Sequence, residues 1–280
     1  MPRKPALSPS RAGDFQQCPL LFRYRTVDRL PEPPSPAATL GTLVHAVLER
    51  LYDLPAAQRT VDAAHARLEP QWRAMIDQDP RLADLHADPA AESTWLAEGR
   101  QRLATYFELE NPQRLEPAAR EEMVEVQLED GPLLRGIIDR IDIAPDGSIR
   151  IVDYKTGKTP DPRWGERKER FQMRFYALVV ERIRERRPAL LQLLFLRDGG
   201  RLEIRPTGDD IAKVEHEIRE LWAEITAAAS AGRFRPRTSK LCGWCSFQEQ
   251  CPEFGGIEPP LDPDAVERAL GVRPVAGAPS

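Results

Sequence analysis

The sequence predicts an α/β protein in which helices alternate with groups of short strands. From Thr39 to Tyr52 the apolar residues recur at helical spacing, which predicts a buried amphipathic helix. From Met123 to Tyr154 apolar and polar residues alternate instead, which predicts strands. The 280 residues are 41% hydrophobic and 30% charged, a composition typical of a globular protein with one or two domains and a sizeable core.

The other elements follow from caps, turn residues and changes of period. A first helix begins after Ser8 or Ser10 and runs to Tyr24, with an interruption at Cys18-Pro19. We interpret residues 55–118 as a helical insertion, and residues 258–280 as a proline-rich flexible tail with a short helix starting near Pro263. The remaining expected elements are helices 58–78 and 91–110, an antiparallel meander of strands 123–128, 133–143 and 149–154, helix 166–186, strands 191–196 and 202–205, and helix 209–231.

Charge and hydropathy exclude several classes of protein. The 40 lysines and arginines against 44 acidic residues give a net charge of −4, which argues against wholesale polyanion binding but leaves local patches open. We find neither the apolar core of a secretory signal nor a run near the ~18 apolar residues of a membrane span. We therefore expect a cytoplasmic protein with no membrane partner.

Two segments are locally basic. Residues 155–187 contain eleven Lys/Arg and five Asp/Glu, and Arg233, Arg235, Arg237 and Lys240 form a second run without an acidic residue. Such segments are candidates for phosphate contacts, although a solvated helix face is the alternative for residues 181–187. The best DNA-binding candidates lie near the polar motifs described next: Arg163, Lys168, Arg170 and Arg174.

A cluster of acidic residues and one lysine falls on the predicted meander. Asp139 lies on the second strand, and Asp153 lies at the end of the third, so adjacent antiparallel strands can bring both carboxylates to one edge, where they suit Mg²⁺ or Mn²⁺. Lys155 is two residues after Asp153 and shares its face, where an ammonium can orient or deprotonate a water. His45 can add a nitrogen ligand. The alternative is that Asp139, Arg140, Asp142, Asp153 and Lys155 are surface charges in weak salt bridges, and that His45 is a core histidine.

Four short segments carry a resemblance to a known family. They are Gly41-Thr-Leu-Val-His45, Gly136-Ile-Ile-Asp139, Asp153-Tyr-Lys-Thr-Gly157 and Gln172-x-x-x-Tyr176, in that order. Together they resemble the PD-(D/E)XK nuclease superfamily, and in particular its RecB-like exonuclease branch. The resemblance extends from about Leu7 to Phe254 and implies a restriction-endonuclease-like core, with a mixed central sheet flanked by helices.

The resemblance also implies a role for each matching residue. A divalent ion would be held by His45, Asp139 and Asp153, the attacking water would be assisted by Lys155, and the DNA channel would be lined by Gln172 and Tyr176. Asp153 stands where many relatives carry Glu. Asp142 could substitute for one of these ligands. Glu49, one turn past His45, could add a water-mediated contact, and a structural role is the alternative for it.

The four cysteines are clustered at three positions and isolated at the fourth. Cys242, Cys245 and Cys251 form C-x₂-C-x₅-C, and Cys18 precedes a proline near the other end. In a reducing cytosol they are not expected to form structural disulfides, and by spacing alone four thiolates suit a tetrahedral Zn²⁺ or a [4Fe–4S] cluster. The Cys-Pro pairs at both ends resemble the iron–sulfur staple of AddB-type and CRISPR-adaptation nucleases. That resemblance implies a structural [4Fe–4S] cluster joining the N- and C-terminal segments.

The function implied is a Mg²⁺- or Mn²⁺-dependent DNA exonuclease occupying residues 1–257, acting on single-stranded or frayed ends in repair or recombination. The chain has no G-x-x-x-x-G-K-[ST] motif, so we expect any helicase to be supplied by another chain. Three alternatives stay open: a nuclease for CRISPR spacer acquisition, a catalytically silent iron–sulfur DNA-binding subunit of a helicase–nuclease complex, and a zinc-stabilised interaction module.

Overall fold

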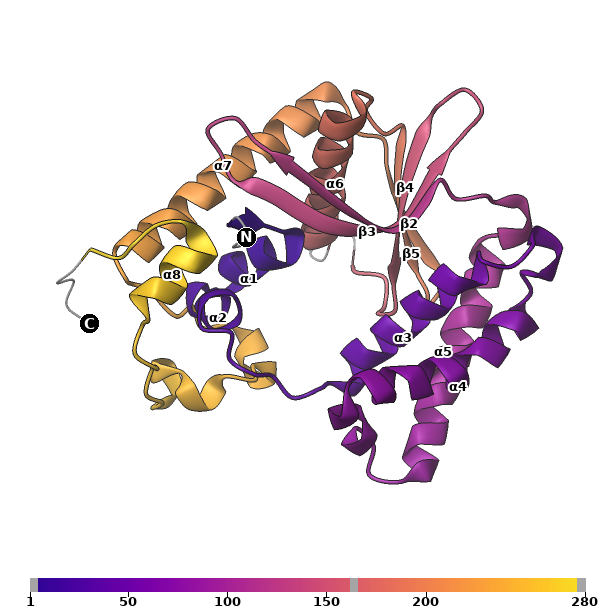
Figure 1. Ribbon diagram of the computed structural model, residues 1–280, viewed down its shortest axis with the longest axis horizontal. Coiled ribbons are helices and arrows are strands. Elements are labelled where there is room, and N and C mark those ends of the chain that lie inside the picture. The colour runs from indigo at the N-terminus through magenta and orange to yellow at the C-terminus, as the bar shows by residue number, and fades with distance from the viewer. Residues whose placement is uncertain (1–4, 162–165, 276–280) are drawn as a thin grey trace. The chain divides into compact units, whose positions relative to one another are not determined.

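The structure, a computed structural model, describes residues 5–161 and 166–275 (Figure 1). The chain divides into two compact units. Unit 1 consists of Met1–Pro33, Val124–Gly136 and Gly208–Ser280, and unit 2 consists of Pro34–Met123 and Ile137–Thr207. None of the described helices is long and apolar enough to cross a membrane.

Three helices form one layer of unit 2, and Figure 1 shows them next to one another: α3 (Pro36–Leu51), α4 (Val61–Gln78) and α5 (Pro89–Leu109). Each begins at a polar cap, Ser35, Thr60 or Asp88, whose side chain accepts a backbone N–H of the first turn. Their apolar faces, which include Trp72 and Tyr106, share one core with residues of two strands, which include Val152, Tyr154 and Leu194. The helices expected within residues 55–118 are therefore part of the core of unit 2.

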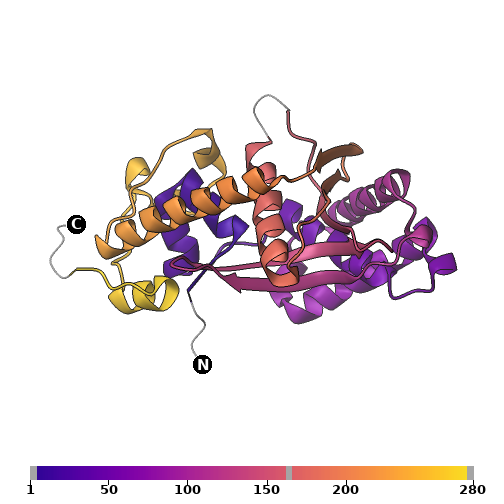
Figure 2. The ribbon, with the colours of Figure 1, turned by 90° about the horizontal axis from the view of Figure 1, so that it is seen from above.

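The strands of unit 2 form a mixed sheet, as predicted. Strand β3 (Leu133–Ile143) pairs antiparallel with β4 (Ile149–Lys155), β4 pairs parallel with β5 (Leu190–Phe195), and β5 pairs antiparallel with β6 (Gly200–Ile204). The parallel pair requires a crossover, which α6 (Arg167–Arg184) supplies (Figure 2). In the β3–β4 register Arg140 is opposite Val152, so one further step places Asp139 opposite Asp153.

Unit 1 is built from both ends of the chain. The predicted N-terminal helix is divided at Cys18 into α1 (Pro9–Gln17) and α2 (Pro19–Phe22), because the residue before a proline favours extended backbone and Pro19 then begins the second helix. Helix α7 (Gly208–Ser230) is followed by the cysteine segment, and α8 (Pro263–Leu270) begins at the residue expected. A two-residue strand, β1 (Ala6–Leu7), pairs parallel with Leu133 and Leu134 of β3 and was not predicted.

Most predicted elements lie within a few residues of the observed ones, and the largest difference is strand β2 (Ala119–Gln127). It pairs with β3 and begins four residues before Met123, where the prediction started it. The added residues are Ala-Arg-Glu-Glu, which carry no alternation of apolar and polar side chains. This extension adds Glu121 to the strand.

Candidate active site

The backbone of Tyr154 on β4 holds two of the predicted site residues in unit 2. Its N–H donates to Asp139 Oδ2 at 2.7 Å, and its carbonyl oxygen lies 3.0 Å from His45 Nε2. A carbonyl oxygen only accepts, so Nε2 must carry the proton of a neutral His45. The other ring nitrogen, Nδ1, then carries no proton, and its lone pair is available to bind a metal ion.

His45 Nδ1 faces two carboxylates. It lies 3.5 Å from Asp139 Oδ2 and 3.8 Å from Glu121 Oε1. His45, Glu121 and Asp139 each offer one ligand atom, and these three atoms all lie within 4.8 Å of one another. Among the described residues, no other group of three His, Cys, Asp or Glu side chains is as close. One imidazole nitrogen with carboxylate oxygens fits a divalent cation such as Mn²⁺ or Mg²⁺.

Glu121 is the functional candidate that sequence reasoning missed. It sits near the start of β2 with a backbone φ of 45°, a left-handed conformation that is uncommon outside glycine and that recurs at functional sites. The sequence pointed instead to Glu49, which lies close enough for its charge to raise the pKa of Glu121. The charged stretch around Glu121 offered no sequence signal that distinguished it from a solvated strand end.

The electrostatics of Asp139 and Glu121 favour a bound cation. Burial raises the pKa of Asp139 well above its ordinary range, and the negative charge of Asp153 adds to the effect. Burial likewise raises the pKa of Glu121, against the opposing influence of His45. Each carboxylate is therefore harder to ionise than in water, and a cation at this position would compensate both charges.

Asp153 and Lys155 form a second polar group connected through Gln172. Lys155 Nζ lies 2.8 Å from Asp153 Oδ2 and donates to Gln172 Oε1 at 2.8 Å, and Gln172 Nε2 donates to Asp153 Oδ1 at 2.7 Å. Burial acts to lower the pKa of Lys155, but the charge of Asp153 and the contact with it outweigh this and raise it. Lys155 is therefore a fixed, protonated donor at neutral pH.

The alternative interpretation of these charges as solvated surface residues is wrong for Arg140 and Asp153, which are 0% and 3% exposed. Asp153 accepts from Gln172 of α6, and Arg140 donates to the hydroxyls of Tyr52, Tyr106 and Tyr154, so both charges are enclosed by other side chains. Asp142, considered as a substitute ligand, is instead paired with Arg140 Nε at 3.1 Å and Arg150 Nη2 at 2.8 Å. It does not belong to the acidic group around His45.

Helix α6 carries the remaining predicted residues. Tyr176 is buried one turn after Gln172, and burial raises its pKa, so its hydroxyl stays protonated. Arg170 pairs at 2.5 Å with Glu166, the residue just before the helix, and Arg174 lies half-buried one turn further on. Arg163, another DNA-binding candidate, lies outside the described residues.

All four cysteines line one pocket of unit 1, together with Tyr24, Arg237 and Phe247. Their thiols are free, and Cys18, Cys245 and Cys251 pack against an apolar cluster that contains Leu20 and Phe247. Burial raises the pKa of Cys251, and the other three cysteines act in the same direction. The structure thus brings the distant Cys18 to the C-terminal trio.

Comparison with known proteins gives a consistent family. The profile of the PD-(D/E)XK nuclease superfamily matches residues 6–252. The Gene 69 protein of Mycobacterium phage L5 is 30% identical over 128 residues, which cover 45% of this chain and 41% of that protein. The Gene 69 protein of Mycobacterium phage D29 is 22% identical over 291 aligned residues, covering 89% and 97%.

Two further similarities concern named nucleases. A 55-residue stretch, 20% of this chain, is 46% identical to an ATP-dependent helicase/deoxyribonuclease subunit of Streptococcus mutans but spans only 5% of that protein. Among solved structures, a candidate exonuclease from Eubacterium rectale superposes with a TM-score of 0.58 at 13% identity, covering 92% of this chain and 91% of the other, which supports the fold. From the profile match over residues 6–252, we conclude that this chain belongs to the PD-(D/E)XK nuclease superfamily.

Proposed function

We propose that this chain is a Mg²⁺- or Mn²⁺-dependent DNA exonuclease that acts on single-stranded or frayed ends during repair or recombination. The observation that carries the proposal is the arrangement around Tyr154, whose backbone orients Asp139 and His45. The next residue, Lys155, is held beside Asp153. Acidic residues and one imidazole beside a protonated lysine suit metal-dependent hydrolysis of a phosphodiester.

The residues that would hold the cation are His45, Asp139 and Asp153, with Glu121 added by the geometry of the site. When bound, a divalent cation supplies Lewis-acid polarisation of a phosphoryl oxygen and lowers the pKa of a coordinated water. Lys155, protonated and fixed by Asp153 and Gln172, serves to orient the attacking water and to stabilise negative charge that develops on the phosphoryl oxygens. Tyr154 fixes the ligand geometry through its backbone.

The DNA path would run along α6. Tyr176 shares a helix face with Gln172, and Arg170 and Arg174 lie on the same helix, where they would contact phosphates. The match to a helicase/deoxyribonuclease subunit supports a helicase supplied by another chain as partner. Processing of DNA ends fits such a partnership because a motor would deliver unwound strands to the site.

The four cysteines are proposed to hold a [4Fe–4S] cluster that links the N- and C-terminal segments of unit 1. All four cysteines line one pocket, so thiolates from both ends of the chain are available to one group. In a [4Fe–4S] cluster each of four thiolates binds a different iron atom, whereas four thiolates around a single Zn²⁺ are the alternative.

The experiment uses anaerobically purified full-length protein and end-labelled DNA. Linear single-stranded, linear double-stranded and circular single-stranded substrates are incubated with Mg²⁺, with Mn²⁺ or with EDTA. The proposed activity requires that linear single-stranded DNA is degraded when a metal is present, with or without degradation of linear double-stranded DNA. The circle should resist degradation. The position of the label reveals the polarity. Cleavage of the circle would instead indicate an endonuclease, and no cleavage with either metal would contradict the proposal.

A further inference from the structure

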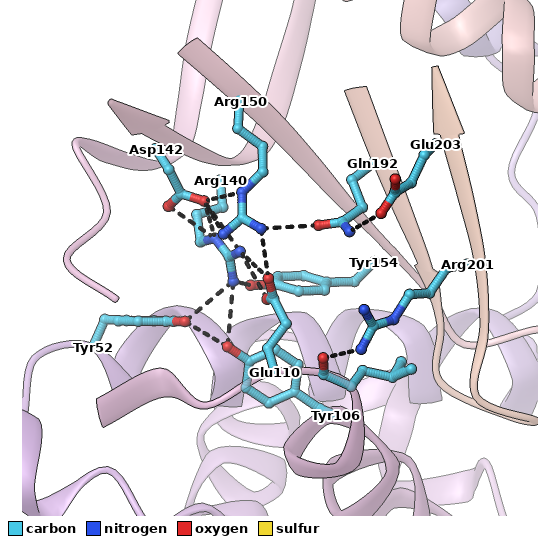
Figure 3. A network of polar contacts seen from close by, with 11 residues as sticks. Tyr52, Tyr106, Glu110, Arg140, Asp142, Arg150, Tyr154, Gln192, Arg201 and Glu203 are labelled. Atoms are coloured by element: carbon cyan, nitrogen blue, oxygen red, sulfur yellow. Dashed lines mark hydrogen bonds and ion pairs between the residues drawn. The ribbon is translucent and has the colours of Figure 1, made fainter. Parts of the chain in front are cut away.

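A fully buried arginine lies immediately next to Asp139. Arg140 of β3 is 0% exposed, and Figure 3 shows its guanidinium at the centre of a polar network within unit 2. Its partners are three tyrosine hydroxyls and two carboxylates: Tyr154 at 2.8 Å, Tyr52 at 3.1 Å, Tyr106 at 3.3 Å, Glu110 at 2.7 Å and Asp142 at 3.1 Å. The guanidinium is therefore enclosed by fixed oxygen acceptors.

The network joins the helical layer to the strands. Tyr52 directly follows α3, Tyr106 and Glu110 come from the end of α5, and Asp142 and Tyr154 come from β3 and β4. Arg150 completes it by binding Glu110 at 3.0 Å and Asp142 at 2.8 Å. Two arginines thus balance two carboxylates, so charges that would be costly to bury alone are matched and held in one geometry.

A buried ionic network of this size is weak evidence for a contribution to stability, because apolar side chains of similar volume often serve as well. Its position suggests a different role. The Tyr154 hydroxyl accepts from Arg140 Nη1, the Tyr154 N–H donates to Asp139, and the Tyr154 carbonyl accepts from His45. Tyr154 is therefore held by its side chain at one end and orients two site residues with its backbone at the other.

We propose that Arg140 is a positioning residue for the divalent-cation site, acting through the Tyr154 hydroxyl. It does not touch the cation or the DNA. By holding the hydroxyl of Tyr154 beside those of Tyr52 and Tyr106, it fixes the peptide groups that set the orientation of Asp139 and the tautomer of His45. Partners beyond the direct ligands commonly tune metal affinity in this way. This inference rests on the proposed function, because it assumes that His45 and Asp139 bind the cation.

The test is a calorimetric titration of the DNA-free, full-length protein with Mn²⁺, comparing wild type with Tyr154→Phe and Arg140→Lys. Tyr154→Phe removes one hydroxyl and leaves Arg140 four partners, so it keeps the fold even if Arg140→Lys does not. We expect each folded variant to bind Mn²⁺ about tenfold more weakly, the lower end of the range for such partners. Cleavage at saturating Mg²⁺ should recover, with an unchanged KM for DNA.

The matched control is Arg59→Lys. Arg59 is also a buried arginine of unit 2, 4% exposed, and it donates to the backbone carbonyls of Leu54 and Leu115 and pairs with Glu116. It also donates to the carbonyl of Tyr52 and lies over the Tyr52 ring, but it has no contact with Tyr154 or Arg140 among those the structure describes. We expect this variant to lower the unfolding temperature while Mn²⁺ affinity and cleavage stay at the wild-type level.

The outcomes separate this inference from the proposed function. If wild type binds Mn²⁺ and cleaves DNA but Tyr154→Phe binds Mn²⁺ equally well, the positioning role is refuted and the nuclease stands. If Arg59→Lys weakens Mn²⁺ binding as much as Tyr154→Phe does, the effect is general loosening of the fold and the inference again fails. If wild type neither binds Mn²⁺ nor cleaves DNA, the proposed function itself fails.

Discussion

Replacing Gln172 by leucine tests the connection between Asp153 and Lys155. The amide of Gln172 accepts from Lys155 Nζ at 2.8 Å and donates to Asp153 Oδ1 at 2.7 Å, so the variant loses two hydrogen bonds to charged groups. Each such bond contributes about 1.5–3 kcal/mol. Lys155 keeps its 2.8 Å contact with Asp153, so we assign the loss of about one bond to the positioning of the ammonium.

A loss of about 1.5–3 kcal/mol from transition-state stabilisation corresponds to a decrease in kcat of about 10- to 150-fold. The assay measures kcat on end-labelled DNA at saturating Mg²⁺, and binding of the same DNA is measured separately in Ca²⁺. We expect kcat to fall in this range while DNA affinity changes little, because the phosphate contacts proposed for α6 come from Arg170 and Arg174.

Gln192 of β5 provides a matched control, since it makes the same kind of bridge elsewhere. It is 4% exposed, accepts from Arg150 Nη1 at 3.1 Å and donates to Glu203 Oε1 at 2.9 Å (Figure 3). Gln192→Leu should cost about 1–3 kcal/mol of stability and leave kcat within about twofold of wild type. An unchanged kcat in Gln172→Leu, or equal losses in both variants, would refute the reasoning.

Three further predictions concern charge, the cysteines and the core. Burial raises the pKa of Asp139, so the protonated carboxyl favours the folded state, and this contribution is lost as pH rises through the raised pKa. Asp139→Asn should therefore increase the unfolding temperature of the metal-free protein at pH 8 but not near pH 4. The same variant should abolish cleavage. A decrease in thermal stability at pH 8 would contradict this explanation. Anaerobically purified wild type should be brown and contain iron and sulfide in equal amounts, both lost in Cys245→Ser, whereas a colourless protein with one equivalent of zinc would exclude the cluster. The Trp72 side chain is 0% exposed, and its ring centroid lies 4.8 Å from that of Trp95, so Trp72→Ala should lower the free energy of unfolding by about 3–5 kcal/mol. Trp244 is 81% exposed, and Trp244→Ala should lower it by less than about 0.5 kcal/mol. Similar losses in both variants would contradict the assignment of the core.

The strands that carry the candidate site could be predicted because their local pattern agrees with their environment. The sequences of β3 and β4 contain alternating or consecutive apolar residues and are bounded by turn residues. Their predicted limits therefore agree with the observed limits to within one residue. The approach of Asp139 to Asp153 then follows from antiparallel register alone. His45 joined this group through its motif, since helical spacing gives no information about which strand a helix covers.

What the sequence left undetermined depends on contacts between distant segments. Glu121 lies in a charged stretch, and its place beside His45 follows from the pairing of β2 with β3. Arg140 resembled a solvated strand residue because its five acceptors are dispersed from Tyr52 to Tyr154 along the chain. A buried charge can be recognised in a sequence only when its partners are local. Here only Asp142 is close in sequence, and Tyr106 and Glu110 come from a helix that was expected to belong to an insertion.

The most direct test of the proposed nuclease centre is cleavage of labelled linear DNA by Lys155→Ala, compared with Lys213→Ala, which replaces an exposed lysine on α7. Both variants should fold, because Lys155 is the last residue of β4 and Lys213 is exposed. We expect Lys213→Ala to cleave DNA at the wild-type rate with Mg²⁺. Lys155→Ala should lose cleavage by at least about 100-fold, as for the loss of a single charge-stabilising group, while still binding Mn²⁺ and DNA. Cleavage by Lys155→Ala at the wild-type rate would contradict the proposed function of this site.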